Sequence, residues 1–261
     1  MDLPMVSAPR AFGGGMVIAA ALVAVSLAGF GGSAGATPAW VKRALALDRS
    51  SDRQIPAPTT ARYVSDEGGG FVLDRSGRRT LLKFDDSPEV WVLSASRGPR
   101  GDLIYTNDLG EPLLRATKLG GMTVFTSRRP DGAPVALLGP CGPLRLSPLG
   151  PVALYQRLVQ ASVRSSRAAQ HLIGYEAEGA DINSDGLIAD AAGVTMEAMI
   201  ALAARPGGKA LLSRVGKVSF VSGPEPAVSV NAGMVAVIIV PSRGIAGRPS
   251  SERVLRALGA R

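Results

Sequence analysis

Short runs of apolar and β-branched residues alternate with turn residues between Tyr63 and Leu146. The runs recur at intervals of roughly 8 to 12 residues, the spacing of consecutive strands joined by tight turns. Turns are expected where Gly, Pro, Asn and Asp gather, at residues 74–77, 85–88, 107–110 and 129–132. No helical period competes, so the pattern predicts an antiparallel β-meander with strands at 71–73, 80–84, 90–93, 103–106, 113–116, 122–126 and 135–138.

The pattern changes to helical spacing after Pro151, and apolar residues then recur every three or four positions as far as Ile173. Ser250 is a good N-cap for a closing helix, which Gly259 would end. The run of Val and Ile at 235–240 is apolar on both faces and predicts a central strand. The remaining elements are expected as helices at 187–204, 208–215 and 251–258 and strands at 218–222 and 227–230.

We therefore expect an α+β fold. An antiparallel β-rich N-terminal half, residues 63–146, is followed by a C-terminal half of helices and an antiparallel sheet, residues 147–261. The two halves are expected to form one compact unit.

The chain begins with the three-part pattern of a secretory signal peptide at residues 1–36. An uncharged apolar stretch, 13–30, precedes small residues that include a cleavage tripeptide, Ala34-Gly35-Ala36. Residues 37–62 are rich in Pro and polar residues and predict a mobile lead-in. We expect a periplasmic or secreted protein with no transmembrane domain after cleavage. The alternative is an uncleaved segment that anchors the protein in the inner membrane.

Composition excludes several classes of protein. Hydrophobic residues make up 46% and charged residues 19% of the 261 residues, which argues against disorder. One Cys and one His cannot form an internal disulfide or a Cys/His zinc cluster. Aromatic residues, at 5%, are too few for the stacking platforms of single-strand nucleic-acid binders.

The net charge of +8 is unevenly distributed. Residues 171–204 carry a net −6, and the stretches before and after them, 37–170 and 205–261, each carry +7. The basic residues are scattered and form no single run, so we expect no nucleic-acid partner. They predict solvated faces or contact with an anionic envelope surface.

The best local candidate for a ligand site is a calcium-like loop with Asp181, Asn183 and Asp185 at the first, third and fifth positions. Side-chain oxygens at this spacing converge on one ion, and Gly186 permits the sharp turn. The twelfth position is Ala192, where a bidentate carboxylate is expected. The alternative is a loop that uses Asp and Asn as turn and N-cap residues. Calcium is the single cofactor for which the sequence offers a candidate site.

A basic stripe is expected on one face of the first helix, because Arg157, Arg164, Arg167 and His171 lie at helical spacing. It predicts a solvated polar face, or a surface that holds an anionic ligand or the acidic stretch.

No catalytic set is predicted. Asp85, Asp86 and Glu89 would supply the two carboxylates of a glycoside hydrolase, but turn residues are the simpler interpretation. Cys141 lies in a Gly-Pro-Cys-Gly-Pro turn and is expected to be a structural thiol, because His171 is the single His that could serve as its base.

Four stretches carry a resemblance to a known family: LLKFDDSPEVWVL (81–93), GPRGDLIYTNDLGEPLLRATKLGGMTVFT (98–126), IADAAGVTMEAMIALAARPGGKALLSRV (188–215) and SRGIAGRPSSERVLRAL (242–258). Together they resemble a family of exported alphaproteobacterial proteins that is catalogued as a domain of unknown function. The resemblance implies export and a single β-then-α/β unit, and it carries over no site residues. The expectation is a non-enzymatic envelope protein that binds an envelope protein partner or assists assembly, with a weak calcium-binding module and an exported hydrolase as the alternatives.

Overall fold

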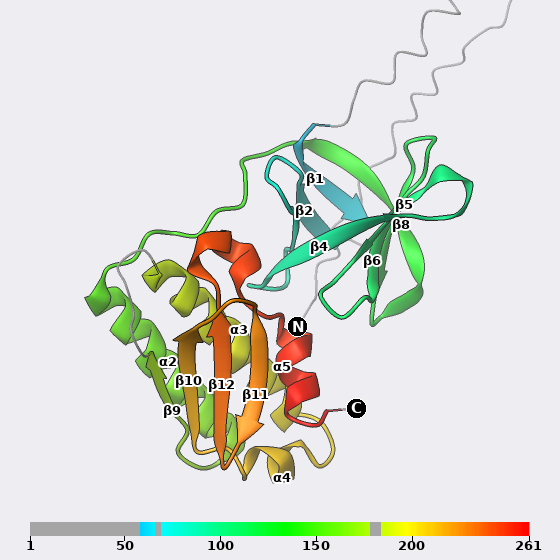
Figure 1. The fold of residues 1–261 in the computed structure, drawn as a ribbon. Coiled ribbons are helices and arrows are strands. Elements are labelled where there is room, and N and C mark those ends of the chain that lie inside the picture. Colours follow the sequence, from blue (N-terminus) through cyan, green and yellow to red (C-terminus); the bar gives the residue numbers. More distant parts are fainter. Residues whose placement is uncertain (1–57, 66–68, 178–183, 261) are drawn as a thin grey trace, which may run out of the picture. The chain divides into compact units, whose positions relative to one another are not determined.

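Eight consecutive antiparallel strands close into a barrel in the N-terminal half (Figure 1). The computed structural model describes residues 58–65, 69–177 and 184–260, all within the compact unit 56–261. The expected signal peptide lies outside the described residues. The barrel strands are β1 (Thr60–Ser65), β2 (Gly70–Asp74), β3 (Thr80–Phe84), β4 (Val90–Arg97), β5 (Leu103–Thr106), β6 (Pro112–Ala116), β7 (Met122–Thr126) and β8 (Arg129–Pro140).

The barrel core follows from the alternation of apolar residues along the strands, which sends every second side chain inward. Its largest fully buried side chains are Phe71, Leu73, Leu82, Leu93 and Leu114. Each strand pairs with the next along the chain, and β1 pairs with β8 to close the ring. The seven predicted strands of the meander are thus confirmed, whereas the first strand, β1, and the closure of the barrel were not predicted.

Two boundaries of the barrel differ from the prediction. β1 begins at Thr60, within the stretch expected to be a lead-in. The turn before β8 lies at Ser127 and Arg128, because Thr126 already pairs with Arg129. Residues 129–132, expected as a turn, therefore belong to the strand.

The C-terminal half contains helices and a four-stranded sheet in the order β11-β12-β10-β9. An irregular linker, residues 141–150, connects it to the barrel. A short 3-10 segment, η1 (Pro99–Gly101), lies in the barrel half. The elements of the C-terminal half are α2 (Pro151–Ala169), β9 (Gly174–Ala177), α3 (Asp185–Ala203), α4 (Gly208–Leu212), β10 (Lys217–Ser222), β11 (Ala227–Asn231), β12 (Met234–Ile239), η2 (Pro241–Gly247) and α5 (Ser251–Ala257).

The prediction of an antiparallel C-terminal sheet is wrong. β10 pairs in parallel with both β9 and β12, and only β11 runs antiparallel to its neighbour β12. Between β9 and β10 the chain passes through α3, and a helical crossover of this kind returns it to the same end of the sheet. β9 was not predicted: the expected first helix ran as far as Ile173, whereas the observed helix ends at Ala169, and Gln170 adopts a left-handed conformation. The central position expected for the 235–240 strand is confirmed.

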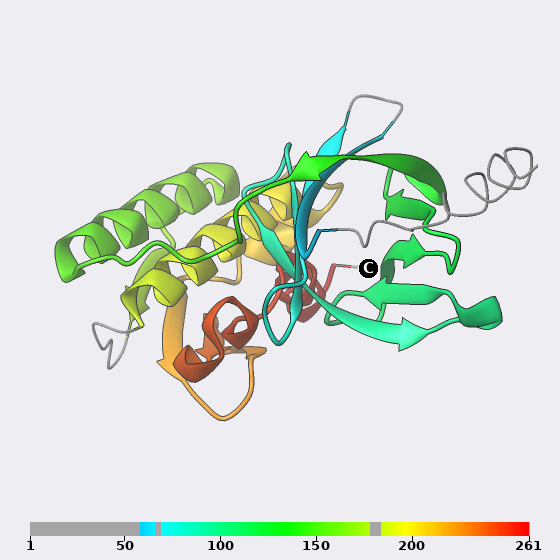
Figure 2. The ribbon, with the colours of Figure 1, turned by 90° about the horizontal axis from the view of Figure 1, so that it is seen from above.

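Helices α2 and α3 run side by side and cover one face of the sheet (Figures 1 and 2). Phe220 of β10 and Val237 of β12 point into the core beneath them. Among the described residues, α3 is the one helix long and apolar enough to span a membrane, and most of it is buried inside this core. We therefore describe α3 as the central core helix of the C-terminal half.

Candidate functional site

A groove lies where the β3–β4 hairpin, the linker and helices α2 and α3 meet, with a volume of about 870 Å³. Trp91 of β4, with Leu146 and Leu149 of the linker, supplies apolar side chains. Ala189 and Gly193 lie on the α3 side, and space is open where Gly193 would carry a Cβ. The small residues of α3 therefore leave room for a ligand beside a largely apolar lining.

The charges of this groove are unequally neutralised. Three of its acidic residues are already paired, because Glu197 contacts Arg164 at 3.2 Å and both Glu89 and Asp190 contact Arg248. Within the described part of the chain, the side chains of the cationic lining residues Lys83, Arg145 and Arg157 form no ion pair or hydrogen bond. Among the acidic side chains, the same is true of Asp86. The charged lining side chains without such a contact among the described residues are therefore three cations and one carboxylate, while Glu89 and Asp190 share the single charge of Arg248.

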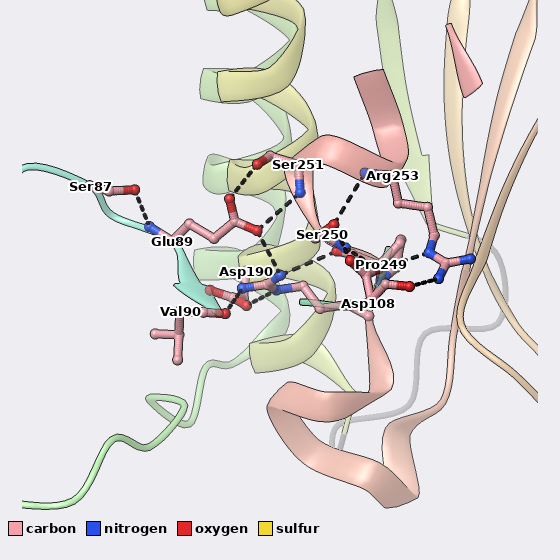
Figure 3. Close-up of polar contacts among 10 residues, drawn as sticks. Ser87, Glu89, Val90, Asp108, Asp190, Pro249, Ser250, Ser251 and Arg253 are labelled. Carbon is pink, nitrogen blue, oxygen red and sulfur yellow. Dashed lines mark hydrogen bonds and ion pairs between the residues drawn. The ribbon is translucent and has the colours of Figure 1, made fainter. Parts of the chain in front are cut away.

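Beside the groove, a buried ion-pair cluster joins the barrel to the C-terminal half (Figure 3). The Arg248 side chain is 1% exposed and reaches Glu89 of the barrel and Asp190 of α3. Its Nη1 lies 3.4 Å from Glu89 Oε1, and its Nη2 donates to the carbonyl oxygen of Val90 at 2.9 Å. A guanidinium this deeply buried requires such partners, because an unpaired buried charge is costly.

Glu89 also binds the first turn of α5. The Ser251 backbone N–H donates to Glu89 Oε1 at 3.0 Å, and the Ser251 hydroxyl donates to Oε2 at 2.5 Å. Burial raises the pKa of Glu89, and the Arg248 charge and the Ser251 hydrogen bonds oppose that rise. Both carboxyl oxygens of Glu89 are thus engaged in holding the helix terminus.

A second barrel carboxylate, Asp108, contacts the same helix terminus (Figure 3). It accepts hydrogen bonds from the Ser250 backbone N–H at 3.2 Å and from the Ser250 hydroxyl at 2.5 Å. Ser250 is the N-cap, as predicted, since its hydroxyl accepts from the Arg253 backbone N–H at 3.1 Å. Arg253 Nε donates to Asp108 at 2.8 Å. Carboxylates placed here complement the positive end of the α5 dipole.

In the same first turn of α5, Glu252 lies beside Glu111 of the barrel. Both carboxyl groups accept from Asn107 Nδ2, at 2.8 Å and 3.0 Å. Burial, followed by the hydrogen bond and repulsion from Glu111, raises the pKa of Glu252 to about 8. The same hydrogen bond, together with Asn107, lowers the pKa of Glu111. One of the two carboxyl groups is therefore protonated near neutral pH.

The calcium-like loop is only partly described. Asp181 and Asn183 lie outside the described residues. Asp185 begins α3 and is buried, and its Oδ2 accepts no hydrogen bond within the described residues. In this part of the chain no group of three or more acidic, His or Cys side chains is arranged to hold a metal. Calcium binding stays a prediction.

The expected basic stripe is divided by the structure. Arg157 and Arg164 both line the groove, and Arg164 pairs there with Glu197, a member of the acidic stretch. Arg167 lies in the last turn of α2 and does not line the groove. His171 follows the helix, and its Nε2 lies 2.7 Å from the carbonyl oxygen of Val215.

The carboxylates considered for hydrolysis are separated by their partners. Asp85 pairs with Arg62 at 2.6 Å, and Glu89 is buried against Arg248 and Ser251. Asp86 is the one member of the trio that no contact within the described residues engages. Cys141 is half-buried, and its backbone N–H donates to the Thr60 carbonyl oxygen at 3.2 Å.

Sequence reasoning missed Arg248, Asp190 and the groove residues Lys83, Trp91 and Arg145. Arg248 lies between Gly247 and Pro249, and nothing in that local sequence distinguishes a buried Arg from an exposed one. One signal was present: Asp190 on the apolar α3 predicts a buried carboxylate that needs a cationic partner.

Comparisons with known proteins give one match. A family model described as "Domain of unknown function (DUF4908)" matches residues 41–258. No curated protein and no solved structure matches the chain. The match covers the barrel, the groove and α5, so these features belong to the matched region.

Proposed function

Because the chain belongs to the family DUF4908, a domain of unknown function, we propose a function from its own geometry: a non-enzymatic envelope module that holds a partner in the groove. The observation that carries this proposal is the excess of unpaired cations, Lys83, Arg145 and Arg157, beside an apolar wall. Cations that line a cleft with apolar walls focus their field into it and attract an anionic partner.

The buried polar groups beside the groove support binding in preference to catalysis. Glu89 accepts from Ser251 and Arg248, and Asp190 accepts from Arg248. A general acid or base must be able to reach a substrate proton. The carboxylates that the structure buries here act as structural acceptors, so we propose a binding role and assign no catalytic residue.

Site-specific photo-crosslinking tests the partner proposal. Gln160 lines the groove, whereas Gln156, one turn earlier on α2, is exposed outside it. We expect benzoylphenylalanine at position 160 to crosslink a partner in the native envelope and the same group at position 156 to give no such product. Equal crosslinking at both positions, or none at position 160, would contradict the proposal.

The export part of the proposal has its own test. The mature protein is expected to begin after Ala36 and to fractionate with the periplasm or the medium. Mass spectrometry of the isolated protein identifies its first residue. An intact Met1 in the membrane fraction would support the anchored alternative, and an intact Met1 in the cytosol would contradict export.

A calcium-stabilised loop is the second candidate function. The buried Asp185 Oδ2, which has no hydrogen-bond partner among the described residues, favours it. We expect millimolar calcium to raise the melting temperature of the protein and to have no effect on Asp185→Asn. Titration calorimetry that detects no heat with calcium would remove this candidate.

A further inference from the structure

We propose that the groove binds an extended, acidic peptide segment of a partner protein. This inference rests on the proposed function and adds the chemical class of the ligand. It is carried by three features of the described residues: unpaired cations, unused main-chain groups in the linker and an apolar wall.

The cations come from three different elements. Lys83 belongs to β3, Arg145 to the linker and Arg157 to α2. A compact anion such as phosphate would be held by cations that converge on one point and by buried donors. The groove, at about 870 Å³, is much larger than one phosphate ion and is lined by three cations that are unpaired within the described residues, so it suits a larger ligand that carries several negative charges.

The linker supplies main-chain groups. Residues 141–150 form neither helix nor strand. Within the described part of the chain, the backbone N–H groups of Arg145, Leu146 and Ser147 donate no hydrogen bond. A peptide that lies alongside an irregular or edge segment pairs with such groups as an added strand does. Acyl chains have no use for these donors, so the geometry favours a peptide over a lipid.

The apolar side chains of the groove predict the sequence pattern of the bound peptide. Trp91, Leu146 and Leu149 line the groove together with the cations. An extended peptide sends alternate side chains to opposite sides. Acidic residues that alternate with apolar ones would therefore place carboxylates against Lys83, Arg145 and Arg157 and apolar groups against the wall.

Selection from a display library of short random peptides, with the full chain as bait, tests the inference. We expect selected peptides to be enriched in Asp and Glu alternating with Val, Leu or aromatic residues. Arg145→Glu/Arg157→Glu should weaken their binding about tenfold or more, and higher salt should weaken it in the wild type. The matched control is Arg167→Glu, on the same helix outside the groove, which should leave binding unchanged.

Two further readouts locate the peptide. Binding should change the fluorescence of Trp91, measured in a Trp40→Phe background in which it is the single Trp. Binding should also slow hydrogen exchange at residues 145–147. If hydrogen exchange slows only at residues outside 145–147, the inference is overturned.

The outcomes separate this inference from the proposed function. Selected peptides without acidic enrichment, or peptides whose affinity Arg145→Glu/Arg157→Glu leaves unchanged, overturn the acidic-peptide inference. Vesicles of phosphatidylglycerol that compete for the groove where peptides do not would assign it to an anionic lipid and overturn the inference as well. The photo-crosslink at position 160 tests the groove as a binding surface independently of either result.

Discussion

The barrel and the C-terminal half reach a buried core by opposite routes. In the barrel every strand pairs with its neighbour in sequence, and the single long-range pairing is the closure of β1 on β8. In the C-terminal half, β10 pairs with β9 and β12, and each partner is reached across an intervening helix or strand. The barrel is thus built from local contacts, and the C-terminal half from non-local ones.

The two halves also differ in how polar groups are used. The barrel places carboxylates and an amide at the ends of its strands: Glu89, Asp108, Glu111 and Asn107. Their partners in the C-terminal half are Arg248 and residues of the first turn of α5. Hydrogen bonds and ion pairs therefore join the two halves, although each half has an apolar core of its own.

The largest expected effect comes from removing Arg248. Arg248→Met leaves Glu89 and Asp190 as carboxylates without their buried cation, which should cost about 3–5 kcal/mol. Unfolding in urea would be followed by Trp91 fluorescence for the barrel and by circular dichroism for the helices, in the Trp40→Phe background. We expect coincident transitions in the parent and separated transitions in the variant. Coincident transitions in both would show that the halves are coupled by other contacts.

The next largest loss of stability should come from substitutions that create a cavity in one of the two cores. Leu82→Ala in the barrel and Leu212→Ala in the C-terminal half each remove a fully buried side chain and should cost about 2–5 kcal/mol. In the Arg248→Met background, Leu82→Ala should shift only the barrel transition, which is followed by Trp91 fluorescence. Leu212→Ala should shift only the helix transition, which is followed by circular dichroism. A shift of both transitions by either change would contradict the independence of the cores.

A smaller effect is expected from the proton shared by Glu111 and Glu252. The folded pKa of Glu252, about 8, lies above that of an unfolded Glu, so stability is highest below the unfolded value and falls as the pH rises toward the folded one. Because Glu252 is only half-buried, we expect a loss of about 1 kcal/mol, or about 2–4 °C in melting temperature, between about pH 5 and about pH 9. Glu252→Gln should reduce this slope, and an unchanged slope would contradict the shared proton.

The smallest effect should come from the surface pair of Arg62 and Asp85. Their side chains are 45% and 39% exposed, so Asp85→Asn should change stability by less than about 0.5 kcal/mol. Denaturation at low and high salt would measure it. A larger loss would show that Asp85 has a role beyond this ion pair.

The sequence was sufficient for seven of the eight barrel strands, β2 to β8, because their contacts are local. Each run of alternating residues pairs with the following run, so the pattern of one strand predicts its partner. The closure was not predictable, because β1 follows a Pro-rich stretch and meets β8 only in three dimensions. The parallel pairing of β9 was also missed, since GYEA is too short and too polar to distinguish from a helix end.

The candidate site was predictable in part: helical spacing placed Arg157 and Arg164 in a basic stripe, and both line the groove. Arg248 was not predictable, since its partner Glu89 lies 159 residues earlier in the chain. Charge patterns along a sequence identify which residues share a helix face. They do not identify which charges meet when distant elements pack, and that meeting determines whether a cation is neutralised or available.

Because α5, which begins at Ser251, follows the end of the barrel at Pro140 by more than 100 residues in sequence, the contacts of Glu89 and Asp108 have a consequence for biosynthesis. All eight barrel strands are made before α5 is, so Ser250 and Ser251 are absent while the barrel first forms. A ribosome-stalled or truncated chain that ends before residue 250 would leave these barrel acceptors facing water and would lack the helix that joins the halves. These contacts between the halves therefore form only after Ser250 and Ser251 have been synthesised.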